Sequence, residues 1–117
     1  MALYVCTFLP GGDEDAGNEK VVISQERFDS IERAAERAEG LFPMLESLRF
    51  EEHSSFLGVD DQAALASELE HLIEAFDSIR PPIDEATRPM LETLLRVTKR
   101  ASMEGFELWF LGEASSA

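Results

Sequence analysis

Hydrophobic residues in this chain follow two spacings, one typical of strands and one typical of helices. Residues 2–9 (ALYVCTFL) are apolar on both alternating sets, a pattern typical of a central strand that is covered on both faces. A Pro-Gly-Gly turn ends this segment, and residues 20–23 (KVVI) predict a second strand antiparallel to it. Residues 48–53 favour a short third strand, residues 54–59 a loop, and residues 106–111 (FELWFL) a last strand.

Three further segments carry the 3-and-4 spacing of amphipathic helices. The first follows Ser24, a good N-cap, the second is capped by Asp60, and the third runs from near Ala86 to Gly105. The second has the clearest apolar stripe, formed by Leu65, Leu69, Leu72, Phe76 and Ile79.

The resulting order, β-β-α-(β)-α-α-β, predicts an α+β domain. We expect a small mixed or antiparallel sheet of three to four strands with three helices. Three helices are too many for one face of so small a sheet, so a three-layer arrangement is the alternative. The length of 117 residues predicts one domain over residues 1–117, with residues 112–117 as a frayed tail.

Cysteine content and hydropathy bear on where the protein works. Cys6 is the only cysteine, so no internal disulfide can form, as suits the reducing cytoplasm. The apolar N-terminus has no basic segment before it, and no run of about 18 apolar residues occurs. We therefore expect a cytoplasmic protein that neither spans a membrane nor carries a signal peptide.

The net charge of the chain narrows the choice of binding partner. The chain has 24 acidic and 10 basic residues, a net charge of −14. Such a chain repels phosphate backbones and anionic lipids, which argues against direct binding to nucleic acid or to a membrane surface. A basic protein is the natural partner, although acidity that serves only solubility is an equally simple explanation.

The acidic excess is concentrated in the middle of the chain. Residues 46–85 hold 11 acids and two bases, whereas residues 86–117 hold four of each. On the second helix, acids spaced by 4 and 3 residues share one ridge, without a lysine or arginine one turn away on it. More acids precede this helix, around an aromatic residue that could anchor a partner or plug the core edge. The predicted partner-binding residues are Glu51, Glu52, Phe56, Asp60, Asp61, Glu70, Glu74 and Asp77.

No residue pattern in the sequence predicts catalysis. Glu68 and His71 have the Glu-x-x-His spacing of di-iron bundles, but such sites need a second pair and further carboxylates. Asp13 and Asp15 begin a calcium-loop pattern that fails at its later positions. Cys6 fits a structural thiol, and Trp109, which shares a strand face with Glu107, fits either the core or a half-exposed site. We expect no enzyme activity, no metal and no cofactor.

Several short stretches resemble the immunity protein 70 family. They are YVCTF at 4–8 before an acidic turn, EKVVISQERFDSIERAA at 19–35, FP at 42–43, HSS at 53–55 and RPMLETLLRVTKRASMEGFELWFL at 88–111. The likeness spans most of the chain and is one of layout, not of a catalytic signature. It departs from the family after the histidine, where this chain has Ser-Phe-Leu-Gly in place of an acidic-aromatic stretch.

The resemblance implies a bacterial protein that binds and neutralises a cognate polymorphic toxin. The alternative is an intracellular adaptor or a homodimeric module without a toxin partner, and the sequence leaves homo-oligomerisation open. A small enzyme that uses the region of His53 is a third hypothesis.

Overall fold

The computed structural model describes residues 2–11, 14–17, 20–37, 54–56, 58–78 and 85–112. Four strands form one sheet: β1 (Ala2–Phe8), β2 (Val21–Ser24), β3 (Ser54–Phe56) and β4 (Glu107–Gly112). The helices are α1 (Gln25–Arg37), α3 (Val59–Glu74) and α4 (Thr87–Glu104), with a short 3₁₀ turn, η1 (Phe76–Ser78). This order confirms the α+β class.

The sheet is antiparallel throughout, in the order β2-β1-β4-β3. The apolar first strand is central, as its composition predicts. Of the loop predicted at 54–59, Ser54 to Phe56 instead pair with β4, and α3 already begins at Val59. Leu57 lies outside the described residues. The strand predicted at residues 48–53 lies outside the described residues.

Local signals explain where the helices begin and end. The Arg27 amide donates a 3.4 Å hydrogen bond to the Ser24 hydroxyl, which confirms Ser24 as the cap of α1. Gly58, not Asp60, is the N-cap residue of α3. Gly105 follows α4 with φ 75°, and the Phe106 amide bonds back to the Ala101 carbonyl over 2.9 Å. This left-handed residue ends the helix and turns the chain into β4.

Replacing Gly105 with alanine is expected to lower the free energy of unfolding by about 1 kcal/mol, because a Cβ atom is unfavourable in the left-handed region. No heavy atom lies within 4 Å of the added Cβ, so the loss comes from the backbone alone. Urea unfolding measures it. Gly58→Ala is the control, since φ there is −91° and the site is equally open. Equal losses in the two variants would contradict this explanation of the turn.

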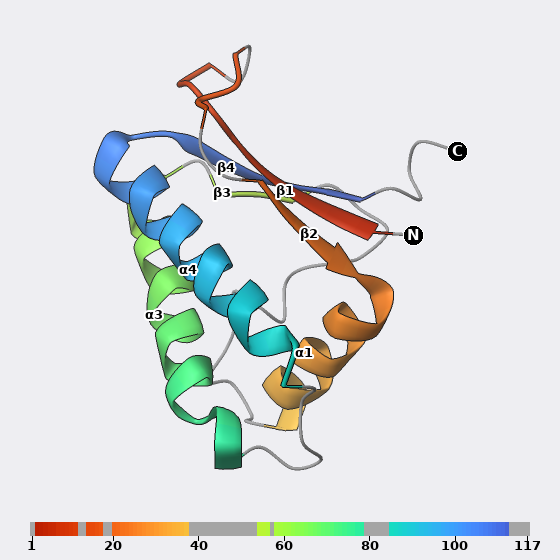
Figure 1. Ribbon diagram of the computed structural model, residues 1–117. Coiled ribbons are helices and arrows are strands. Elements are labelled where there is room, and N and C mark those ends of the chain that lie inside the picture. The colour runs from red at the N-terminus through yellow and green to blue at the C-terminus, as the bar shows by residue number, and fades with distance from the viewer. Residues whose placement is uncertain are drawn as a thin grey trace.

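The hydrophobic core lies between the helices and one face of the sheet. Leu3 and Val5 of β1, together with Leu108 and Phe110 of β4, are fully buried there. The same core contains Phe28 and Ile31 of α1, with Leu65, Leu69, Leu72 and Phe76 of the predicted stripe and Leu91 and Leu94 of α4. Ile79, the last residue of that stripe, lies outside the described residues. All three described helices lie on this side of the sheet (Figure 1). The expectation that they could not share one face was wrong, because α3 and α4 pack lengthwise against each other and α1 packs at the β2 end.

A buried glutamine joins the helical layer to the sheet. The Gln62 side-chain amide donates to the carbonyl oxygens of Phe56 (2.8 Å) and Phe106 (2.7 Å). It thereby ties the first turn of α3 to the end of β3 and to the residue before β4. Gln62 is completely buried, so water does not compete for these bonds.

Candidate protein-binding surfaces

The outer face of α3 carries four of the predicted partner-binding acids. Asp60, Asp61, Glu70 and Glu74 are all exposed. The first two lie in the first turn of the helix, where negative charge is favourable beside the unpaired amide groups. Within the described part of the chain, only Glu70 of these four forms an ion pair. The exposed acids therefore lie at both ends of α3, with the paired Glu70 between them.

The acidic ridge differs from the predicted one in two ways. Lys99 of α4 lies 2.7 Å from a Glu70 carboxylate oxygen, so a base from the neighbouring helix relieves the middle of the ridge. Asp77 is exposed but belongs to η1, because α3 ends at Glu74. The ridge of α3 therefore ends at Glu74, and Asp77 belongs to the turn that follows it.

Phe56 is not an exposed anchor. Its exposed fraction is 6%, and its ring packs edge-on against Phe110, with centroids 5.5 Å apart. Pairing of Phe56 with Leu108 turns the ring toward the core face of the sheet. Phe56 must therefore be removed from the predicted binding surface. Glu51 and Glu52 lie outside the described residues.

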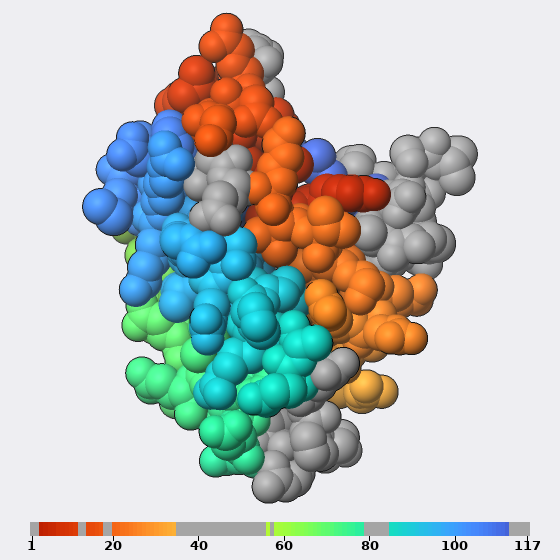
Figure 2. Space-filling view, in the orientation of Figure 1, coloured from red at the N-terminus to blue at the C-terminus, as the bar shows by residue number. Residues whose placement is uncertain are grey.

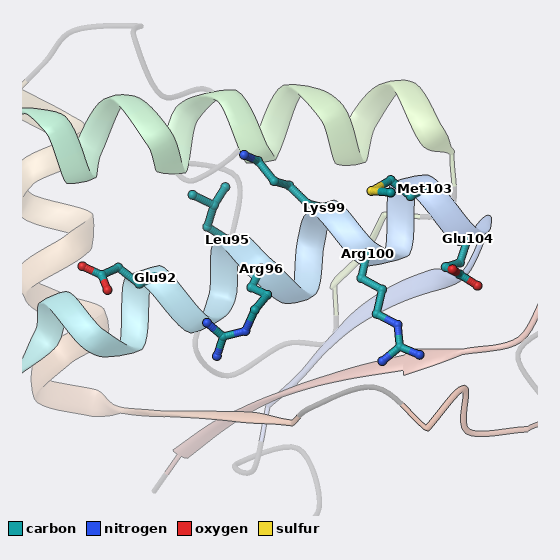
Figure 3. A pocket seen from close by; sticks show the side chains of 7 residues that line it. All are labelled: Glu92, Leu95, Arg96, Lys99, Arg100, Met103 and Glu104. Atoms are coloured by element: carbon teal, nitrogen blue, oxygen red, sulfur yellow. The ribbon is translucent and has the colours of Figure 1, made fainter.

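A shallow basic furrow of about 380 Å³ follows the outer face of α4 (Figure 3). Lys99 extends toward α3, whereas Arg96 and Arg100 point to the opposite side of the helix. Met103, at the end of the furrow, is 85% exposed. The even charge balance of residues 86–117 hid this cluster, in which three bases line the furrow against two acids, Glu92 and Glu104.

The face of the sheet that points away from the helices is apolar and partly open. Cross-strand partners lie on the same face of a sheet, and the register pairs Tyr4 with both Val22 and Leu111, and Cys6 with Trp109. Tyr4 is 40% exposed and Val22 is 53% exposed. Cys6, Trp109 and Leu111 are half-buried. We call this surface the open face. Its members are Tyr4, Cys6, Phe8, Val22, Glu107, Trp109 and Leu111.

Trp109 lies on the open face as a half-buried residue, beside Glu107. Its indole N–H donates to a Glu107 carboxylate oxygen over 3.1 Å, and its ring meets Phe8 edge-on at 6.5 Å. The other Glu107 oxygen accepts the Gly11 amide over 2.9 Å. The Glu107 carboxylate is thus held by two donors, and the ion pair of Lys20 with Asp15 lies beside Cys6 at the edge of the same face.

A hairpin extends beyond the sheet next to the open face; we call residues 9–11 and 14–17 the finger (Figures 1 and 2). The Leu9 amide donates to the Glu14 carbonyl over 2.7 Å, and the Ala16 amide donates to the Thr7 carbonyl over 3.0 Å. A hydrogen bond from the Gly17 amide holds the pKa of Asp15 below its ordinary value, and the Lys20 ammonium, 3.0 Å away, lowers it further. The Asp15 carboxylate is therefore ionised at neutral pH and fixed in place.

Cys6 lies on the open face, paired with Trp109 and close to the charges of Lys20 and Asp15. Burial raises the pKa of its thiol above the ordinary value; the charge of Lys20 opposes the shift, and that of Asp15 adds to it. A thiol in this state is a poor nucleophile at neutral pH.

Among the described residues, no group of three or more His, Cys, Asp or Glu side chains could hold a metal ion. Glu68 is buried on α3, whereas His71 is exposed. In the same part of the chain, no helix combines the length and the apolar character needed to cross a membrane.

Comparison with models of protein families, with curated proteins and with solved structures found no match to this chain. The resemblance to the immunity protein 70 family gains no support from these comparisons. It stays an expectation from the sequence.

Proposed function

We propose that this chain is a bacterial immunity protein that binds and neutralises a cognate polymorphic toxin through an acidic surface. The observation that carries the proposal is the outer face of α3, where Asp60, Asp61 and Glu74 are exposed and form no ion pair within the described residues. Carboxylates without a cation beside them are open to the lysines and arginines of a basic partner, which this face would attract.

The overall charge supports the same partner. A net charge of −14 raises the rate at which a basic protein meets this chain and disfavours acidic partners. Many toxins that act on nucleic acids need a basic surface to bind phosphates. A rigid acidic protein can cover such a surface and compete with the substrate.

Co-expression tests the proposal. Cells that produce the toxin domain encoded beside this gene are expected to survive when the chain is present and to die when it is absent. The matched control is a toxin domain from a different locus, which the chain should not neutralise. Equal killing by the cognate toxin with and without the chain would overturn the proposed function.

A further inference from the structure

The open face has the composition of the centre of a protein interface. Tyrosine and tryptophan are enriched where partners bind most tightly, and charged residues are depleted there. The open face presents Tyr4, Trp109 and Val22 in a chain that is 29% charged. Its one carboxylate, on Glu107, is already bonded to two donors. An approaching apolar surface would meet little unsatisfied charge.

The size of the open face limits what it can hold by itself. From Tyr4 to Phe8 the strand extends for about 14 Å, and three strands span roughly 10 Å between their axes. The resulting area of a few hundred Å² at most is well below the roughly 800 Å² per partner of a stable interface. A stable partner must therefore also contact the surroundings of the open face.

These surroundings are acidic. Glu14 and Asp15 lie on the finger at one end of the open face, and both are exposed, with Asp15 in an ion pair with Lys20. At the same end, Gln62 ties the first turn of α3, with Asp60 and Asp61, to the residue preceding Glu107. A partner that extends past the apolar centre in this direction meets carboxylates. A second copy of this chain would bring 14 further negative charges to that contact.

We propose that the open face is the apolar centre of the surface that binds a basic protein, with the finger as its acidic rim. This inference rests on the proposed function, since it gives the toxin its place on the chain. It adds an anchor that charge alone does not supply: apolar side chains of the partner pack on Tyr4, Val22 and Trp109, while its lysines and arginines face the finger.

Trp109 provides the measurement, because it is the only tryptophan. The chain is labelled with 5-fluorotryptophan, and the unlabelled toxin domain encoded beside its gene is added. We expect the single fluorine resonance to shift until one toxin domain is bound per chain. Val22→Lys is expected to weaken binding at least about tenfold, since it places a cation opposite a basic partner. Lysine is well tolerated on edge strands, and thermal melting checks that the variant folds.

Met103→Lys is the matched control, because Met103 is an exposed apolar residue on the far side of the helical layer. Its affinity should stay within about twofold of the parent. If the complex forms but the fluorine resonance does not shift, and if Val22→Lys binds like the parent, the inference is overturned and the proposed function stays intact. A toxin domain that fails to bind the parent chain would overturn both. A resonance that shifts with the chain's own concentration, without toxin, would assign the open face to a second copy instead.

Discussion

Replacing Gln62 with leucine is expected to lower the free energy of unfolding by about 2–4 kcal/mol. Leucine fills a similar volume but donates no hydrogen bond, so the carbonyl oxygens of Phe56 and Phe106 lose their donor in a buried setting. Each such group costs about 1–3 kcal/mol when it has no partner, and leucine offsets part of the sum because it also removes the unpartnered Gln62 Oε1. Because small domains are stable by only about 5–15 kcal/mol, urea unfolding should show a large shift of the midpoint.

The control for this prediction is Ala63→Ser, one position further along α3, where the side chain is exposed. It should change stability by less than about 0.5 kcal/mol. A Gln62→Leu variant as stable as the parent would mean that the two carbonyls find other donors, and that Gln62 does not join α3 to the sheet.

Reversing charge on the outer face of α3 is expected to slow association with the basic toxin domain by about tenfold and to flatten its salt dependence. The change is Asp60→Lys with Glu74→Lys, two exposed acids without an ion pair within the described residues. Charges at an interface act mainly on the association rate, through long-range attraction. Stopped-flow mixing at several salt concentrations measures both effects.

A matched variant separates local charge from total charge. Glu26→Lys with Asp29→Lys changes the net charge equally but lies on α1, where both residues are exposed. This variant should associate less than about threefold more slowly than the parent. Equal slowing by the two variants would show that only the total charge matters, and would contradict a binding role for the α3 face.

Much of the fold could be predicted because local signals agreed with the hydrophobic spacing. Ser24, Gly105 and the leucine stripe of α3 each fix an element through chain geometry close by in sequence. The end of β3 was missed, since Ser54 and Ser55 have no apolar pattern and become strand only by pairing with β4.

The candidate site depended more on tertiary packing. The partner of Glu70 is Lys99, which is remote in sequence and meets it only because α3 packs against α4. The aromatic ring of Phe56 could be assigned to solvent or core only once its register with Leu108 was fixed. The two apolar faces of β1 predicted cover on both sides, yet Tyr4 stays exposed because the described helices share the opposite face.

The most direct test of toxin binding by an acidic surface is calorimetric titration of the chain with its toxin domain at rising salt. Between about 0.1 M and 1 M salt, the screening length falls from roughly 10 Å to 3 Å. We predict one-to-one binding whose Kd rises at least about tenfold over this range, with toxin activity lost at equal concentrations. Absence of binding at low salt, or a Kd that does not change with salt concentration, would contradict binding of the toxin by an acidic surface.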